Sequence, residues 1–180
     1  MQDDPNRIGY EWAAHSIYPK RADKQFFRTT VGNEQCLQPY SASIYNISAM
    51  SYGALSKTAI SSLNKGAQLG GFAHNTGEGG ISNFHLEGGD LIWQIGTGYF
   101  GCRNDDGTFS EQLYAEKTSF PQVKMIELKL SQGAKPGHGG LLPGEKNTPE
   151  IAKIRNIQPH IAVHSPAGHT AFSNSVELLY

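Results

Sequence analysis

Apolar residues between positions 57 and 69 keep a helical spacing. A stripe of apolar side chains with this period is typical of a helix that packs one face on a core. Ser56 stands where an N-cap is needed, because its hydroxyl can accept a hydrogen bond from the first turn. Gly70-Gly71 follows, and glycine readily takes the left-handed conformation that ends a helix. The pattern therefore predicts a helix over residues 57–69.

Shorter apolar segments, bounded by glycine and polar residues, are typical of strands. Three further segments are predicted to be helical, the second of them with Thr148 as N-cap and Pro149 at its first position. The predicted strands cover residues 43–50, 72–75, 91–95, 123–128 and 161–163, and the further helices cover residues 110–117, 148–155 and the start of one at 176–180.

Strand, glycine-rich loop and helix follow one another in a repeating order, with the polar loops always after strands. This order predicts a parallel α/β fold, and the loop usage favours a (β/α)8 barrel of the TIM type. About five strand–helix units are present, whereas a complete barrel has eight in about 250 residues. We therefore predict an incomplete barrel over residues 41–180. Residues 1–40, with Trp12, Phe26 and Phe27 among charges, are predicted to be an N-terminal arm that packs on it.

The composition excludes several classes of protein. A net charge of −1, with 17% charged residues, gives no reason to expect a nucleic acid or an anionic membrane as partner. Cys36 and Cys102 are the only cysteines, so neither a disulfide scaffold nor a zinc ribbon is expected, and a reducing, cytoplasmic compartment is predicted. The histidines share no ligand spacing, so no metal site is predicted, and no apolar run is long enough to span a membrane.

The segment Lys129–Gly140 carries the most suggestive chemistry. It follows the predicted strand 123–128 and places Lys129, Gln132 and Lys135 among small residues. Glycine lets a backbone approach a ligand closely, and lysine offers a compact positive charge for a carboxylate, a phosphate or an electron-rich ring. A cationic loop at the carboxyl end of a strand is where α/β folds bind ligands. Pro136-Gly137 also restrains Lys135 more than a solvated lysine requires.

Other side chains keep two interpretations. Glu78, between glycines, is either a solvated turn residue or a carboxylate aimed at a ligand. Arg155 ends a predicted helix, where its charge favours the helix dipole without any ligand. The segment 96–101 matches the dinucleotide fingerprint G-x-G-x-x-G, but turn residues follow it instead of a helix. We predict a tight loop there and no Rossmann site.

Several motifs occur in an order that resembles the FMN-binding barrel domain of glutamate synthase, in particular the shorter proteins of the FMN-binding glutamate synthase family. The resemblance runs from about Tyr10 to the end of the sequence. It implies a (β/α)8 barrel with FMN at the carboxyl ends of the strands. The motifs are Ser48-Ala-Met-Ser-Tyr-Gly-Ala-Leu-Ser56, Asn75-Thr-Gly-Glu-Gly-Gly80, residues 92–101 and Ser131-Gln-Gly-Ala-Lys-Pro-Gly137.

The family reaction is the reductive transfer of an amino group to 2-oxoglutarate, in which reduced FMN delivers a hydride to 2-iminoglutarate. By resemblance, Lys129 lies near the flavin ring, where a cation stabilises the reduced, anionic form. Gln132, Lys135 and Arg155 match residues that hold 2-oxoglutarate. Glu78 matches the carboxylate of the loop between ammonia delivery and substrate, so Lys129 and Glu78 are the predicted catalytic residues.

The same resemblance assigns the cofactor contacts. Ala49, Met50 and Ser51 match the end of the first strand, which runs along the flavin. Gln94 matches a glutamine that contacts it, and Lys129 completes the predicted FMN-binding set. No metal ligand is implied for this chain, although relatives carry an iron–sulfur cluster whose cysteine ligands are not found here.

The chain departs from the family pattern at a few positions. Trp93 stands where glutamate synthases usually have a lysine, and His138 where they usually have a glutamate. The sequence contains no glutaminase domain with its cysteine nucleophile. The expected partners are therefore 2-oxoglutarate with ammonia or glutamine and an electron donor that the sequence does not identify, and a homo-oligomer is compatible with the sequence.

Two other hypotheses remain open at this point. The chain could be a non-catalytic or degenerate half-barrel that needs a partner to fold, because an incomplete barrel exposes a sheet edge and an apolar face. It could instead be part of a flavin oxidoreductase that acts on another 2-oxo or 2-hydroxy acid.

Overall fold

The N-terminal arm is described only in part. Its aromatic residues Trp12 and Phe26 lie outside the described residues, and Phe27 is 44% exposed, so Phe27 is not buried on the rest of the chain. The computed structural model describes residues 6–9, 17–18 and 27–179.

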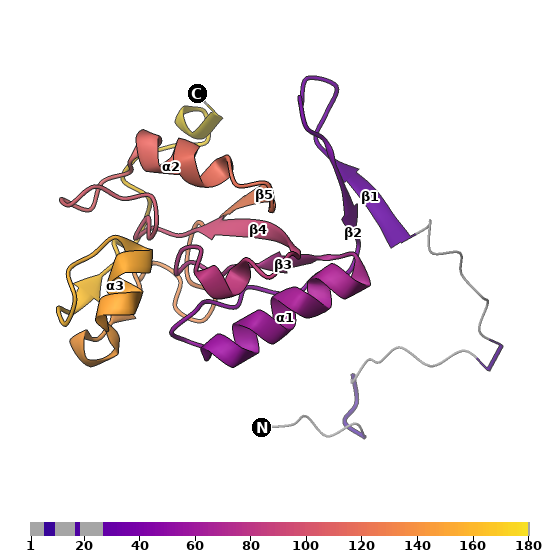
Figure 1. Cartoon of the computed structure of the whole chain (residues 1–180), viewed down its shortest axis with the longest axis horizontal. Coiled ribbons are helices and arrows are strands. Elements are labelled where there is room, and N and C mark those ends of the chain that lie inside the picture. The colour runs from indigo at the N-terminus through magenta and orange to yellow at the C-terminus, as the bar shows by residue number, and fades with distance from the viewer. Residues whose placement is uncertain (1–5, 10–16, 19–26, 180) are drawn as a thin grey trace.

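A parallel sheet of three strands forms the centre of the chain (Figure 1). Its strands are neighbours in the order in which they occur in the sequence, with α2 connecting the second to the third. All three confirm strands that the apolar segments predicted. They are β3 (Ala73–Asn75), β4 (Asp90–Ile95) and β5 (Val123–Leu128).

Three of the four predicted helices are confirmed, together with the predicted caps at Ser56 and Thr148. In α1 (Lys57–Gly70), the Ser56 hydroxyl accepts a hydrogen bond from the Ala59 amide at 3.2 Å, and Gly71 closes the helix with φ 66°. These local interactions satisfy groups that helix ends leave unpaired. The other two are α2 (Glu111–Thr118), capped by Ser110, and α3 (Pro149–Arg155), capped by Thr148.

The predicted first strand over residues 43–50 is wrong as a continuous strand. β2 (Tyr40–Ser43) ends where that strand was expected to begin, and it pairs antiparallel with β1 (Arg28–Val31). The hairpin projects away from the parallel sheet (Figure 1). It also crosses the predicted boundary between arm and barrel at residue 40, and that division of domains stays a prediction.

Asn46 explains why the strand is interrupted. Its amide donates a hydrogen bond to Ser43 O at 2.7 Å and accepts one from the Ala73 amide at 2.9 Å. A side chain that binds nearby backbone in this way competes with the strand ladder. Beyond Asn46, the Ile47 amide donates to Ala73 O at 2.9 Å and Ile47 O accepts from the Asn75 amide at 3.0 Å. This segment therefore still runs along the edge of β3, joined by a parallel bridge at Ile47.

The predicted fifth parallel strand at residues 161–163 is also wrong. A strand forms at β7 (Val163–His164), but it pairs antiparallel with β6 (Leu141–Leu142) in a separate sheet. Ile161 lies outside it and is 52% exposed, whereas strands of a parallel sheet are buried on both faces. Short 3-10 turns complete the structure: η2 (Asn83–His85), η3 (Gly144–Lys146) and η4 (Glu177–Leu179), the last of them where a helix was predicted. The described fold is therefore α/β with a parallel sheet, and it does not form a closed barrel.

The apolar core lies between β4 and α2. Trp93 is fully buried and stacks on Tyr114 of α2 with ring centroids 5.8 Å apart. Ile95, Tyr99 and Cys102 complete the buried cluster. Because side chains alternate along a strand, Gln94 points to the opposite face of β4 from Trp93. The sheet thus has one face packed on a helix and another that carries polar groups.

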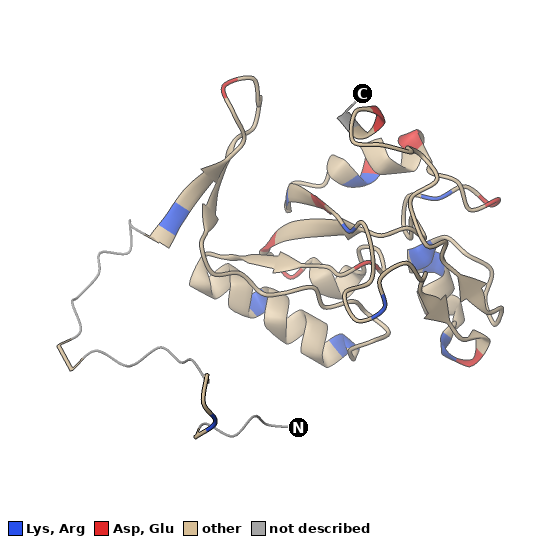
Figure 2. Cartoon of the chain, turned by 180° about the vertical axis from the view of Figure 1, so that it is seen from behind, with Lys and Arg blue, Asp and Glu red and all other residues tan. Residues whose placement is uncertain are grey.

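Charges are dispersed over the chain. Figure 2 shows acidic and basic positions interspersed on helices, strands and loops alike. None of the helices in the described ranges is both long and apolar enough to cross a membrane.

A buried pair of histidines lies at the edge of the sheet. His74 of β3 is fully buried and neither of its ring nitrogens has a hydrogen-bond partner among the described residues. His85 lies with its ring centroid 5.3 Å away, accepts a hydrogen bond from the Ser82 amide at Nδ1 and contacts Met50 O through Nε2. Burial lowers the pKa of His74 to about 4, with the His85 charge acting in the same direction, and burial also lowers the pKa of His85.

We expect the free energy of unfolding to fall as the pH decreases from about 6.5 to about 4. The folded state holds His74 neutral, so its contribution is complete above the ordinary pKa of 6.5 and is lost as the unfolded chain gains protons. The shift corresponds to about 3 kcal/mol. Urea unfolding at several pH values measures it. His74→Leu removes no hydrogen bond seen in the described residues and should reduce the pH dependence to the part that His85 contributes, whereas His164→Gln, at an exposed position of β7, should retain the wild-type profile. A wild-type profile in His74→Leu would contradict the assignment.

Candidate functional site

Glu78, Lys129 and Gln132 form one hydrogen-bonded cluster. The Lys129 ammonium lies 3.3 Å from Glu78 Oε1, and the Gln132 amide donates to both carboxylate oxygens at 2.9 and 3.0 Å. Lys129 also donates to Gln132 Oε1 at 3.3 Å, which fixes the orientation of the amide. Both charged side chains are partly buried, with 27% and 29% of their surface exposed. The structure therefore brings together three of the predicted site residues, among them both predicted catalytic residues.

The carboxyl ends of neighbouring parallel strands place this cluster. Glu78 lies in the turn after β3, where the Gly77 amide donates to Asn75 Oδ1 at 2.9 Å and Gly77 has φ 65°. Lys129 follows β5 directly, and its amide donates to Ile95 O at 2.9 Å. β4 lies between β3 and β5, and Gly96 follows it directly. A Cβ at Gly96 would lie 2.5 Å from Glu78 Oε2. A larger residue at this position would therefore displace the carboxylate from its present place.

Arg155 approaches the cluster from α3. Its guanidinium stacks over the Phe100 ring at 4.9 Å, and a Cβ at Gly79 would lie 3.1 Å from Nη2. Burial lowers the pKa of Arg155, and the nearby Glu78 charge opposes that effect. Its buried Nε has no hydrogen-bond partner in the described part of the chain. An unsatisfied buried donor is costly, so a ligand acceptor at this place would remove the cost.

A cavity of about 190 Å³ lies against these groups. Arg155, Glu78 and Phe100 line it, together with Ser165 and the exposed Lys146. Two cations beside a single carboxylate suit an anionic ligand of a few atoms, and a planar guanidinium suits a carboxylate best. Lys146 was missed by the sequence analysis because it belongs to none of the motifs that directed attention.

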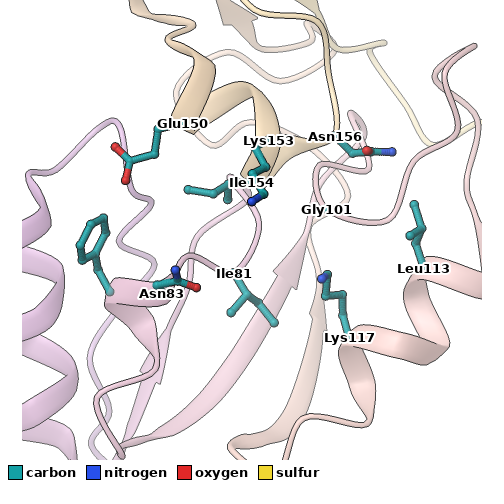
Figure 3. A pocket seen from close by; sticks show the side chains of 10 residues that line it. Ile81, Asn83, Gly101, Leu113, Lys117, Glu150, Lys153, Ile154 and Asn156 are labelled. Atoms are coloured by element: carbon teal, nitrogen blue, oxygen red, sulfur yellow. The ribbon is translucent and has the colours of Figure 1, made fainter.

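A larger cavity, about 380 Å³, lies on the other side of α3 and contains none of the predicted site residues (Figure 3). Lys117 of α2 and Lys153 of α3 reach into it from opposite walls, and Ile81, Leu113 and Ile154 supply apolar surface. Cavity size alone therefore does not locate the charged cluster.

Lys135 does not join the cluster. It lies in the exposed part of its loop, and within the described residues no hydrogen bond or ion pair links it to another predicted site residue. Its assignment to 2-oxoglutarate stays a prediction. The glycines of this loop also serve a purpose other than ligand approach: a Cβ at Gly139 would lie 1.6 Å from Ser165 O, so this glycine lets two backbone segments touch.

The predicted cofactor residues lie along the edge of β3 and on β4. The Met50 amide donates to Asn75 O at 3.1 Å, and Ser51 packs so closely on the following turn that a Cβ at Gly77 would lie 2.8 Å from its amide nitrogen. Ala49 is exposed. This segment therefore borders the turn that carries Glu78.

Gln94 is buried on β4. Its amide nitrogen donates to Glu127 of β5, whereas its amide oxygen has no partner among the described residues. Like the Arg155 Nε, this oxygen is a buried polar atom whose hydrogen-bonding capacity is not satisfied by the described residues.

The segment 96–101 is a tight loop, as predicted. The Tyr99 amide donates to Gly96 O at 3.0 Å, and Tyr99 itself has φ 49°, an uncommon value for a residue with a side chain. The Tyr99 hydroxyl contacts His169, whose other ring nitrogen contacts Lys129 O. Sequence analysis missed this link, because the residues are far apart in the chain and only the tertiary structure brings them together.

Comparisons with known proteins agree on one family. The family model described as "Conserved region in glutamate synthase" matches residues 20–180. The glutamate synthase large subunit-like protein YerD of Bacillus subtilis is 45% identical over 152 residues, 83% of this chain and 29% of that protein. The archaeal glutamate synthase (NADPH) of Methanocaldococcus jannaschii is 35% identical over 166 residues, 92% of this chain and 29% of that protein. The chain thus spans less than a third of the length of these relatives.

We expect Gly139→Ala to destabilise the packing of the loop on residues 165–166, because the added Cβ overlaps a backbone oxygen. Overpacking of this kind costs about 1–3 kcal/mol. Amide exchange at Ser165, whose amide donates to Gly140 O at 2.9 Å, measures the loss directly. Gly133→Ala is the matched control in the same loop, since a Cβ there meets nothing within 4 Å. Equal exchange in the two variants would refute the close approach.

Proposed function

The chain belongs to the glutamate synthase family, and on that premise we propose that the protein carrying it reductively aminates 2-oxoglutarate to glutamate with FMN as cofactor. The parallel sheet is then the first part of a (β/α)8 barrel, whose strand ends carry the reaction. Arg155 lines a cavity together with Glu78, and its buried Nε has no hydrogen-bond partner among the described residues; this observation carries the proposal.

The cavity beside Arg155 is proposed to hold 2-oxoglutarate. A carboxylate in this cavity can accept from the Arg155 guanidinium, and charge-assisted hydrogen bonds of this kind are about twice as strong as neutral ones. Lys146 lines the same cavity and adds a second positive charge. The size of the cavity, about 190 Å³, suits a small dicarboxylic acid more than a large substrate.

Glu78 and Lys129 are proposed to move the protons of imine formation. When ammonia adds to C2 of the oxo acid, the nitrogen loses protons and the oxygen leaves as water. A carboxylate is suited to take the proton from nitrogen, and a neighbouring ammonium to give one to the leaving oxygen. Gln132 holds both groups in place, because its amide bonds to each of them. The products of this step are 2-iminoglutarate and water.

The residues present fit the ring of FMN. The free, buried amide oxygen of Gln94 can accept from a ring N–H, and the exposed Ala49 beside Met50 and Ser51 leaves a small-residue surface for a planar group. Lys129 supplies a positive charge, which stabilises a reduced, anionic ring. Reduced FMN, when bound, supplies the hydride that converts 2-iminoglutarate to glutamate.

We also propose the partners of the reaction. Ammonia, either free or released from glutamine, is the amino donor, and reducing equivalents come from an electron donor. The free thiols of Cys36 and Cys102 fit a reducing, cytoplasmic compartment.

We expect Glu78→Gln to lower the rate at which 2-oxoglutarate and ammonium reoxidise the reduced flavin of the full-length protein. The amide keeps the size of the side chain but cannot accept the proton, which corresponds to a loss of about 100-fold or more. Stopped-flow absorbance of the flavin measures this rate. Glu116→Gln, at an exposed position of α2, is the control. An unchanged rate in Glu78→Gln, or a protein that neither contains nor takes up FMN, would contradict the proposal.

We expect Arg155→Lys to weaken binding of 2-oxoglutarate by about 10- to 100-fold, because the lysine loses the planar, two-pronged contact. The concentration dependence of flavin reoxidation gives the apparent affinity. Lys153→Gln changes a charge on the same helix but faces the other cavity, so it should bind the substrate as the wild type does. Equal effects of the two substitutions would contradict a specific contact between Arg155 and the substrate.

A further inference from the structure

His169 joins the Tyr99 loop to the backbone of Lys129. Its Nδ1 lies 3.1 Å from the Tyr99 hydroxyl, and its Nε2 lies 2.9 Å from Lys129 O. The ring is also held by aromatic contacts, because it stacks on Phe172 at 5.0 Å and packs at a tilt against the Tyr99 ring at 5.3 Å. The imidazole therefore bridges two segments at the strand ends.

The hydrogen bonds assign the tautomer of His169. The Tyr99 oxygen already accepts from the amides of Thr170 and Ala171, at 3.0 and 3.1 Å. Its one O–H is thus the group left to bond His169, and Nδ1 must accept it. A neutral ring then carries its proton on Nε2, where it donates to Lys129 O. Each donor in this series of hydrogen bonds then has an acceptor, and the other neutral tautomer of His169 satisfies neither contact.

This link fixes the second backbone group of Lys129. The Lys129 amide is already held by Ile95 O of β4, and the carbonyl is held by His169. With both groups fixed, the Lys129 side chain starts from a defined position and meets Glu78 and Gln132. Supporting contacts of this kind set the orientation of reacting groups, and small misplacements there are costly to rate.

We infer that His169 is a positioning residue for the reaction: its Nε2–H holds the Lys129 carbonyl and thereby sets the Lys129 ammonium against Glu78. The inference rests on the proposed function of that cluster. Tyr99 orients the imidazole, and the loop over residues 165–172 carries it. His169 contacts Lys129 only through the backbone, so it acts through Lys129 and not on the substrate.

Two substitutions in the full-length protein separate this role from a merely structural one. His169→Gln keeps a donor at the place of Nε2 and loses the acceptor for Tyr99. His169→Asn keeps an acceptor at the place of Nδ1 and loses the donor to Lys129. If His169 positions Lys129, the Gln variant stays within about threefold of the wild-type kcat, and the Asn variant falls by roughly 10- to 100-fold. If His169 only anchors its loop through Tyr99, the order of the two is reversed.

Two readouts do not depend on glutamate formation. The ¹⁵N shifts of the imidazole report its tautomer, and the proton is expected on Nε2. The reduction potential of bound flavin is expected to become more negative in the Asn variant, because a displaced Lys129 stabilises the reduced ring less. An imidazole with its proton on Nδ1, or an Asn variant that loses no more than the Gln variant, would overturn the inference. If the wild type fails to aminate 2-oxoglutarate, the tautomer and the potential still decide it, and the proposed function fails separately.

Discussion

The carboxylate of Glu78 is the interaction on which the arrangement at the strand ends depends. It pairs with the Lys129 ammonium, accepts from Gln132 and acts through its charge on Arg155. Lys129 and Arg155 are partly or largely withdrawn from water. Away from water their like charges repel each other more strongly, and each ion loses hydration. One carboxylate between them offsets both effects. Gly96 leaves room for this arrangement, because a Cβ there would lie 2.5 Å from Glu78 Oε2 and would displace the carboxylate.

The long connection between β5 and α3 carries the remaining parts of the site to the sheet. The buried side chain of Asn147 ties the end of this connection to the segment after α3, because it donates to Gln158 O at 2.6 Å and to Ile161 O at 2.9 Å. A backbone bond from the Gly101 amide to Arg155 O, at 3.2 Å, fixes the end of α3 over the loop after β4. These bonds fix where α3, and with it the Arg155 guanidinium, lies relative to the sheet. The helical period then directs Arg155 to the charged cluster and Lys153 to the other cavity.

Local interactions explain which elements were predictable. The helix caps at Ser56 and Thr148 and the apolar segments of β4 and β5 act within a few residues, so their effect is visible in sequence. The prediction of a continuous strand before α1 was wrong because the Asn46 side chain forms hydrogen bonds to backbone in place of strand-ladder bonds. One of these bonds is to a residue 27 positions away. The prediction of a parallel strand near residue 163 was wrong because β7 pairs with β6, in a separate antiparallel sheet, and not with the parallel sheet.

The sequence by itself determined the parallel α/β order and the helix ends, which follow from periodicity and capping and need no knowledge of distant contacts. That Glu78 and Lys129 belong to one candidate site was implied only by the resemblance of the ordered motifs to a known family. Only the tertiary structure decided that Glu78, Lys129 and Gln132 touch, that Lys135 lies apart from them, and that His169 holds Lys129. Those outcomes depend on how closely separate backbones approach. Glycines and shared hydrogen bonds set that distance across the fold, and no local pattern encodes it.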